Sequence, residues 1–397
     1  MKYAKAAFLR LVTLFLCAFL MSAPLCATAS TTKSDLPFDV ADNIVLLIEA
    51  DTGAIIFSQN EKKRVPIASV TKIMTLLLAF EAIDRGDISL DDAIVISKTA
   101  ASTEGSQAFL DAGAQHKASE LIKTIIIASA NDSAVAIAEH IAGSEAAFAD
   151  MMNKKAAELS MNDTLFKTCT GLPAENQYST AADVSIMARL LMDKATDPRY
   201  AAWFTTWMDT LTHPSGRTTD LTNTNRLIRF YDGATGLKTG YSNEAKHCIA
   251  ACATKGNMRL LTVLLGIDTS KSRFDLAGKL FDYGYSAYEK TAVVKAGDIV
   301  REAVPVKGSS VKSTDLIALE NIYVLTKKGS ADSFSVEENL PDVVTAPVTD
   351  RQSIGSITVT LADGTLLHSP VIISHSEINS GLFAAIGDIL ALWCNAA

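Results

Sequence analysis

The order of the predicted elements between residues 43 and 285 limits the possible folds of this chain more than any other feature. A hairpin is predicted over residues 43–58, helical patterns dominate residues 69–194, strands return at residues 235–266, and a helix is predicted over residues 271–285. Strands at both ends of such a segment bury their apolar faces best in one sheet, with the helices packed on its faces. The sequence therefore predicts an α/β sandwich, an antiparallel sheet flanked by helices.

An almost uninterrupted apolar run follows Ser69. Residues 73–83 are apolar on nearly every side of a helix, which is typical of a helix buried in a core. Pro66 favours an end to the segment before it. The pattern places Ser69 in the first turn of a buried helix and Lys72 on the same face, one turn later.

Ser69 and Lys72 are the residue types that a nucleophile and its base require. A serine hydroxyl is a weak nucleophile until a base removes its proton, and a lysine amine acts as a base only when it is neutral. Burial and a second cation, Lys238, would both lower the pKa of Lys72. The backbone N–H of Ser69, at a helix start, suits a developing oxyanion. For an isolated Ser-x-x-Lys string, the alternative is a capping serine and a lysine that reaches solvent.

A second string, Ser129-Ala130-Asn131, separates two helical apolar runs at residues 121–128 and 132–140. Side chains in a short break between helices can project into a cleft. Ser129 is therefore a candidate to relay a proton to a leaving amine, and Asn131 is a candidate to hydrogen-bond the amide of a substrate. The alternative is an N-cap for the following helix, and the two roles are compatible.

The third string, Lys238-Thr239-Gly240, lies in a predicted edge strand that a hairpin follows. Gly240 allows another backbone to approach closely. Lys238 and Thr239 would face a substrate carboxylate, and the N–H of Tyr241 is a candidate second donor to an oxyanion. Arg273, after the hairpin, is a candidate to add charge for that carboxylate, and the alternative is an ordinary surface arginine.

The three strings are informative in combination rather than singly. Ser-x-x-Lys also occurs at Ser30 and Ser309, and Ser-x-Asn also occurs at Ser58 and Ser160, whereas Lys-Thr-Gly occurs once. In their order and context, the three strings supply a nucleophile, an amine, a hydroxyl with an amide, and a cationic strand edge. This set is nearly complete for opening an amide bond through an acyl-enzyme.

The same triple resembles the signature of penicillin-recognising serine enzymes, β-lactamases and penicillin-binding proteins. Within that group, the chain is similar to the low-molecular-weight D-alanyl-D-alanine carboxypeptidases over nearly its whole length. The stretches that carry this similarity are residues 105–110, 171–172, 178–180, 236–240 and 268–274. One departure is Ala130, since the family usually has glycine between the serine and asparagine of the second string.

The resemblance implies a β-lactamase/DD-peptidase-like fold and a specific reaction. Ser69 would attack the bond between the last two D-alanines of a peptidoglycan stem peptide, with Lys72 as the base. Terminal D-alanine would leave, and water would then hydrolyse the ester. A β-lactam would imitate the dipeptide and acylate Ser69 as a covalent inhibitor. No metal and no cofactor are expected.

Two alternative functions have sequence features that discriminate them. A serine β-lactamase of the same fold commonly carries a deacylating glutamate in a Glu-x-x-Leu-Asn context, whereas Glu175 is followed directly by Asn176 here. A catalytically inactive wall-binding scaffold is the second alternative. The intact Ser69, Lys72 and Asn131 argue against it, because decay of a site usually removes at least one such residue.

Residues 1–29 have the pattern of a secretory signal peptide. Three basic residues precede an apolar run at residues 11–21, and Ala27-Thr28-Ala29 forms a cleavage site. The predicted location is therefore extracytoplasmic, in the periplasm or at the outer face of the cytoplasmic membrane. The chain has a net charge of −8, and removal of this leader takes away only cations. So acidic a protein is not expected to bind nucleic acid.

Four cysteines remain after the leader, Cys169, Cys248, Cys252 and Cys394. They are too sparse for a disulfide scaffold, and Cys248 and Cys252 lie too far apart along one strand to pair with each other. A bridge from Cys169 to one of them is possible, but buried free thiols are the preferred interpretation. The six histidines are scattered and form no recognised metal-binding spacing.

The chain is predicted to have four parts. After the signal peptide at residues 1–29, a catalytic domain spans residues 30–288, and short alternating segments at residues 289–376 indicate a small all-β domain. Residues 377–397 form an amphipathic helical stripe that starts at Ile378 and is too short to cross a membrane. We expect this helix to lie on the membrane surface as an anchor, and packing on the β domain or on a second copy is the alternative.

Overall fold

The structure is a computed structural model that describes residues 36–329, 334–381 and 386. The predicted signal peptide and most of the predicted tail helix lie outside the described residues. The helical elements are η1 (Ala68–Thr71), α2 (Lys72–Arg85), α3 (Lys98–Ala101), α4 (Ala118–Ala128), α5 (Asn131–Ala142), α6 (Glu145–Glu158), α7 (Ala181–Lys194), α8 (Ala201–Thr205), α9 (Leu227–Phe230) and α10 (Ser270–Ala287).

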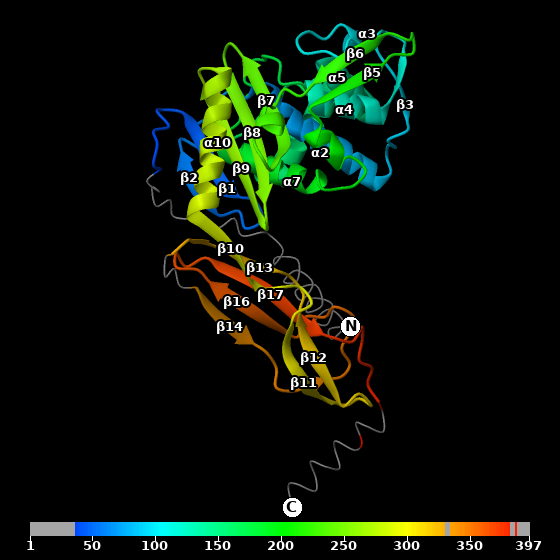
Figure 1. The fold of residues 1–397 in the computed structure, drawn as a ribbon. Coiled ribbons are helices and arrows are strands. Elements are labelled where there is room, and N and C mark those ends of the chain that lie inside the picture. The colour runs from blue at the N-terminus through cyan, green and yellow to red at the C-terminus, as the bar shows by residue number, and fades with distance from the viewer. Residues whose placement is uncertain (1–35, 330–333, 382–385, 387–397) are drawn as a thin grey trace, which may run out of the picture.

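The strands divide between two regions, an N-terminal α/β region and a C-terminal β domain (Figure 1). Those of the α/β region are β1 (Ile44–Glu49), β2 (Ile55–Gln59), β3 (Ala93–Val95), β4 (Gln115–Lys117), β5 (Met208–Thr212), β6 (Thr218–Thr222), β7 (Ala234–Ser242), β8 (Lys246–Lys255) and β9 (Met258–Ile267). Those of the β domain are β10 (Tyr288–Val294), β11 (Ile299–Lys307), β12 (Ser313–Ala318), β13 (Ile322–Lys327), β14 (Ser335–Asn339), β15 (Val344–Thr345), β16 (Gly355–Thr360) and β17 (Leu366–Ile373).

The main sheet of the α/β region joins the two ends of that region, as the sequence predicts. Among the described residues it has five strands in the order β2-β1-β9-β8-β7, and each neighbouring pair is antiparallel. The early strand β1 pairs with β9, so that Leu47 lies opposite Thr262. Every residue of β1 is buried, because helices cover both faces of the sheet. The strand β7, which carries the Lys-Thr-Gly string, lies at the edge of the sheet.

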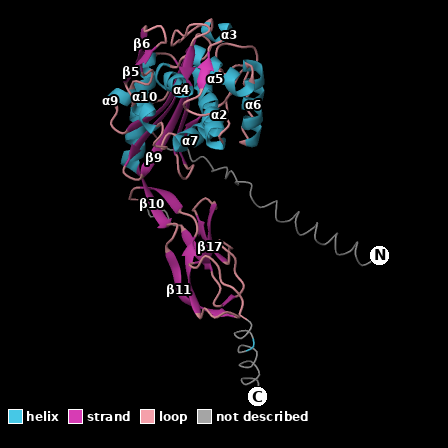
Figure 2. Ribbon diagram, turned by 90° about the vertical axis from the view of Figure 1, so that its right-hand side faces the viewer, coloured by secondary structure: helices cyan, strands magenta, loops and turns pink. Residues whose placement is uncertain are grey.

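Two apolar cores sandwich the sheet. Figure 2 shows α10 on one side of the sheet and α2, α5 and α6 on the other. The larger core contains residues of α2, α4, α5 and α7, and the smaller one contains Phe274, Leu280 and Phe281 of α10. Helix α2 is buried along nearly its whole length, which confirms the prediction from its apolar run. Gly86 ends α2 in the left-handed conformation that favours glycine.

The C-terminal β domain contains a two-stranded sheet, β10-β13, and a six-stranded sheet in the order β14-β16-β17-β12-β11-β15, among the described residues. Leu316, Val359 and Val371 are fully buried in its core. Residues 316–325 do not form one continuous strand. The chain turns at residues 319–321, and β12 and β13 join different sheets.

Ile378 corrects the predicted start of the tail helix. Instead of beginning a helical stripe, Ile378 forms a bridge with Val348 and is 1% exposed in the core of the β domain. The N–H of Gly381 also donates to the carbonyl of Gly308. The chain therefore stays on the β domain as far as residue 381. None of the helices in the described part of the chain is both long and apolar enough to cross a membrane.

The two regions are joined by a buried ion-pair cluster. Helix α10 leads directly into β10 (Figure 1). Lys290, in β10, contacts the α/β region. The Nζ of Lys290 lies 3.2 Å from Oε1 of Glu49, which is fully buried, and also binds the carboxylate of Asp51. The amide of Asn257 donates to the carbonyl of Lys290 at 3.0 Å. These contacts fix the first strand of the β domain against the turn between β1 and β2.

Candidate active site

Ser69 lies in the 3-10 turn η1, directly before α2. The sequence places Ser69 in the first turn of a buried α-helix, whereas the α-helix begins at Lys72 and Ser69 lies in the tighter turn before it. The turn still places the two side chains on one face, because the Nζ of Lys72 lies 3.1 Å from the Oγ of Ser69. A hydroxyl and an amine are therefore in direct hydrogen-bond contact.

Lys72 is fully buried, and its other two partners are neutral oxygens. Its Nζ donates to Oδ1 of Asn131 at 2.6 Å and to the carbonyl of Thr170 at 2.7 Å. Burial lowers the pKa of Lys72 to about 7, and the more distant charges of Asp132 and Glu145 oppose this only in part. In the neutral amine, the two N–H bonds can point at these oxygens, which leaves the lone pair facing the hydroxyl of Ser69.

The Ser129-Ala130-Asn131 string forms the junction between α4 and α5. Ser129 ends α4 with a φ of 63°, and it is 4% exposed. Asn131 is the first residue of α5, and its Nδ2 donates to the carbonyl of Glu104 at 2.6 Å. The alternative role as an N-cap is wrong, since the N-cap position is Ala130 and no side chain caps this helix. The junction instead carries Asn131 to the amine of Lys72.

Sequence reasoning missed the carboxylate that supports this junction. Asp132 is fully buried, and its two oxygens accept the N–H groups of Ala108 at 3.0 Å and Leu110 at 3.1 Å. These bonds fix the loop that holds Asn131, where a Cβ on Gly105 would lie 2.7 Å from Nδ2 of that asparagine. The available signal was an acidic residue inside an otherwise apolar run, directly after the second string.

The edge strand β7 brings the Lys-Thr-Gly string next to Ser69. A Cβ on Gly240 would lie 2.7 Å from the carbonyl oxygen of Ile67 and 3.1 Å from the backbone nitrogen of Ser69, so the predicted close approach occurs. Lys238 is 1% exposed, and its Nζ donates to the carbonyl of Thr239 at 3.0 Å. The three strings therefore meet around Ser69.

Burial and nearby cations act together on Lys238. Burial, with the charges of Lys72 and Arg273, holds the pKa of Lys238 well below its usual value. A bound carboxylate would favour the charged form of this amine. The hydroxyl of Thr239, also predicted to face the carboxylate, donates to Oγ1 of Thr224 at 2.8 Å.

Arg273 is not a surface residue. It is 6% exposed on α10, and its Nη1 donates to the carbonyls of Gly240 at 3.0 Å and Cys248 at 2.9 Å. The guanidinium therefore ties the end of β7 to β8, and burial lowers its pKa to about 10. Tyr241 follows on β7; the residue is 58% exposed, and its ring stacks on that of His247 with ring centres 4.5 Å apart.

The sequence analysis also missed the segment around Thr170, which accepts a hydrogen bond from the amine of Lys72. Thr170 offers only its backbone carbonyl, which leaves no signal in the sequence. A Cβ on the next residue, Gly171, would lie 2.0 Å from the carbonyl oxygen of Ala68, so only glycine fits there. Cys169, Cys248 and Cys252 are buried free thiols, as predicted, and Cys394 lies outside the described residues.

The comparisons with known proteins identify the family. Residues 28–269 match the family described as D-alanyl-D-alanine carboxypeptidase. The chain belongs to this family. Residues 288–378 match a second family, described as the C-terminal domain of penicillin-binding protein 5. The resemblance inferred from the three strings is therefore confirmed.

Individual relatives agree with this assignment. The D-alanyl-D-alanine carboxypeptidase DacF of Bacillus subtilis is 39% identical over 88% of this chain and 89% of its own length. The solved structure of penicillin-binding protein 5 from Haemophilus influenzae is 27% identical, with a TM-score of 0.72 over 87% of this chain and 99% of that one. The solved structure of a peptidoglycan synthesis regulatory factor (PBP3) from Streptococcus pneumoniae is 27% identical, with a TM-score of 0.71 over 86% of this chain and 100% of that one. The predicted fold class is confirmed.

Proposed function

We infer that this protein is a serine-type D-Ala-D-Ala carboxypeptidase that removes the terminal D-alanine of peptidoglycan stem peptides. The observation that carries this function is the contact between Ser69 and a fully buried Lys72 whose pKa lies near 7. Such an amine is neutral in a large fraction of molecules at neutral pH, so it can accept the serine proton. The family match supports the substrate class.

The geometry supports a mechanism through an acyl-enzyme. Lys72 takes the proton of Ser69 as its Oγ attacks the carbonyl carbon of the penultimate D-alanine. The backbone N–H groups of Ser69 and Tyr241 stabilise the oxyanion, and Ser129 passes a proton to the departing amine. D-Alanine leaves, and water then hydrolyses the ester on Ser69. A β-lactam acylates the same oxygen and is released slowly.

The carboxylate of the terminal D-alanine binds beside Lys238, at the middle of β7. The amine of Lys238 supplies a charge there, the hydroxyl of Thr239 supplies a donor once it turns from Thr224 to the carboxylate, and Gly240 leaves room for the substrate backbone. Arg273 acts indirectly by positioning β7, because its guanidinium donates to the carbonyl of Gly240. The positive charge at this position selects peptides with a free carboxyl terminus.

The decisive experiment measures release of D-alanine from a stem peptide that ends in D-Ala-D-Ala, resolved by mass. Ser69→Ala should lower the release by about 10³-fold or more, because the nucleophile is lost. No release by the wild-type protein would instead favour a wall-binding scaffold. The lifetime of the penicillin adduct tests the β-lactamase alternative, since minutes or longer indicate a carboxypeptidase and fast turnover indicates a lactamase.

The protein is also proposed to work outside the cytoplasm, attached to the membrane surface. The leader pattern of residues 1–29 and the apolar stripe after residue 381 support this location. The β domain then separates the catalytic domain from the membrane. Deletion of residues 382–397 should move the protein to the soluble fraction while Ile378 stays in the β domain. Unchanged partition into membranes would contradict the anchor.

A further inference from the structure

Two neighbouring carbonyl groups, in residues 169–170, hold helix α2 at Lys72. The carbonyl of Thr170 accepts a hydrogen bond from the Nζ of Lys72 at 2.7 Å, and the carbonyl of Cys169 accepts one from the hydroxyl of Thr75 at 2.6 Å. Thr75 lies about one helical turn after Lys72 on α2, and all of these residues are buried. The position of this segment therefore decides where the backbone acceptor for the amine of Lys72 lies.

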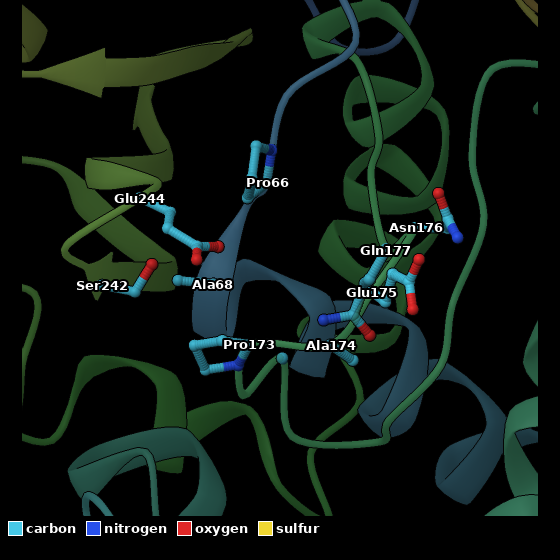
Figure 3. Close-up of a pocket in the computed structure, with 10 residues that line it drawn as sticks. Pro66, Ala68, Pro173, Ala174, Glu175, Asn176, Gln177, Ser242 and Glu244 are labelled. Carbon is cyan, nitrogen blue, oxygen red and sulfur yellow. The ribbon is translucent and has the colours of Figure 1, made fainter.

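Beyond Thr170 the chain borders a pocket. Gly171 and residues 173–177 line this pocket, which has a volume of about 430 Å³. Figure 3 shows residues 173–177 below and to the right of Ala68, which lines the same pocket. A segment that borders open space has little packing on that side, so its position depends on the hydrogen bonds that it makes elsewhere.

Two side chains supply hydrogen bonds to the start of this segment. The amide oxygen of Gln177 accepts the N–H groups of Lys167 and Thr168 at 3.0 Å each. The next N–H along the chain, that of Cys169, donates to Oε1 of Glu145 at 3.0 Å, and the thiol of Cys169 donates to the same oxygen at 3.2 Å. Glu145 therefore ties to α6 the same residue whose carbonyl binds α2.

The start of α6 fixes Glu145 itself. Glu145 is the first residue of this helix, and Ser144 caps the helix by accepting the N–H of Ala147 at 3.2 Å. Phe148, about one turn later, is fully buried in the larger core. A side chain on a packed helix holds its partner more precisely than one on a loop, so Glu145 is well placed to fix the backbone of Cys169.

The direction of the amine of Lys72 depends on its acceptors. In the neutral amine, one N–H can point at Oδ1 of Asn131 and the other at the carbonyl of Thr170, which leaves the lone pair for the hydroxyl of Ser69. If the carbonyl of Thr170 moves, the amine turns with it and the lone pair no longer faces Ser69. A displacement of about 1 Å at a reacting group can slow a reaction by about 10²-fold.

We propose that Glu145 is a positioning residue for Lys72 and acts through the backbone of Cys169 and Thr170. The inference rests on the proposed function, in which Lys72 is the base. The oxygen of Glu145 holds the N–H of Cys169, and thereby the adjoining carbonyl of Thr170. This role is separate from the negative charge of Glu145, because an uncharged side-chain oxygen in the same place accepts the same N–H.

The test compares Glu145→Met with Glu145→Gln. The two new side chains are similar in size and both lack the charge, but only glutamine offers an oxygen to the N–H of Cys169. The measurement is the rate of penicillin acylation at about pH 9, well above the pKa of Lys72 of about 7, so that a small shift of that pKa leaves the rate unchanged. We expect a loss of roughly 10- to 100-fold in Glu145→Met and a rate near that of the wild-type protein in Glu145→Gln.

The step that slows down distinguishes positioning of the base from a change in binding. The loss in Glu145→Met should fall on the rate constant of acylation. The dissociation constant of the initial penicillin complex should stay at its wild-type value, because Lys238 and Thr239 are unchanged.

Met152→Ala controls for a loss of stability. Met152 is fully buried on α6, so this variant destabilises the fold while it leaves the contact between Glu145 and Cys169 in place. Urea unfolding gives the folded fraction of each variant, and the rate per folded molecule should match the wild-type rate in Met152→Ala. Glu145→Asp withdraws the oxygen by one methylene group, should react more slowly than Glu145→Gln, and replaces Glu145→Met if that variant does not fold.

Equal rates per folded molecule in Glu145→Met and Glu145→Gln would overturn the proposal. A loss in Met152→Ala as large as that in Glu145→Met would also overturn it, because any weakening of α6 would then slow the reaction. A wild-type protein that does not react with penicillin fails the proposed function, whereas a reactive wild-type protein with equal rates in the two Glu145 variants fails only this inference.

Discussion

Lys72 in the catalytic site and Lys290 between the two regions are both buried lysines, but their acceptors differ in charge. The amine of Lys290 contacts two carboxylates, Glu49 and Asp51. The amine of Lys72 contacts a hydroxyl, a side-chain amide oxygen and a backbone carbonyl, all of them neutral. The first arrangement keeps the ammonium paired, whereas the second leaves a buried charge without a compensating one.

The comparison shows that the acceptors of a buried lysine, more than its burial, decide what it can do. An ion-paired lysine holds two parts of a structure together, because removing either partner strands a buried charge. A lysine with neutral acceptors loses its proton near neutral pH and becomes available as a base. The same residue type thus serves a structural role in one region and a chemical role in the other.

The largest expected effect on stability comes from Lys290→Met. This change strands the buried carboxylate of Glu49, so the free energy of unfolding should fall by about 3–5 kcal/mol. Urea unfolding of the full chain measures it. Activity per folded molecule should stay near the wild-type value, because Lys290 contacts no residue of the candidate active site among the described contacts.

Lys72→Met is the matched comparison. It should affect stability less, and activity more, than Lys290→Met. It leaves two neutral oxygens without a donor but also removes the cost of burying an amine, so stability should fall less than in Lys290→Met. The rate of penicillin acylation should fall by about 10²–10⁴-fold, the contribution typical of a general base. Equal losses of stability in the two variants would break the distinction between these lysines.

The smallest expected effect comes from removing the negative charge of Glu145, which lies at some distance from Lys72. It sharpens the comparison between the two lysines. Glu145 raises the pKa of Lys72 slightly through its negative charge, while its Oε1 accepts the N–H of Cys169 at 3.0 Å. Glu145→Gln keeps an oxygen for that bond and removes the charge. The pH midpoint of acylation should therefore move down by less than about one pH unit.

Glu158→Gln is the control for this shift, since it makes the same change of charge at the far end of α6. Its midpoint should match that of the wild-type protein. An upward shift in Glu145→Gln would contradict the assigned sign of the interaction.

The sequence alone was sufficient to predict the sheet and the meeting of the three strings. Apolar runs and turn residues report local structure, and the strands at both ends of the α/β region had only one common sheet to join. The need for glycine at position 240 was also predictable, because a strand glycine beside a reactive string indicates close backbone contact.

Other features left no local signal. The carbonyl of Thr170 belongs to the backbone, so no residue type marks it as a partner of Lys72. The pairing of Lys290 with Asp51 joins positions far apart in the chain. Ile378 has the same apolar character in a bridge as in a helix, so its place in the β domain depends on Val348 and not on its neighbours in sequence.

The pH dependence of penicillin acylation of Ser69 tests the central claim most directly, that burial beside neutral acceptors makes Lys72 a base. A lysine with a pKa of about 7 is neutral above that pH, so the second-order rate should rise about tenfold per pH unit below the midpoint and level off above it. We expect the midpoint near pH 7. A rate that is constant from about pH 5 to 9, or one that still rises toward the ordinary lysine pKa of about 10.4, would contradict this account.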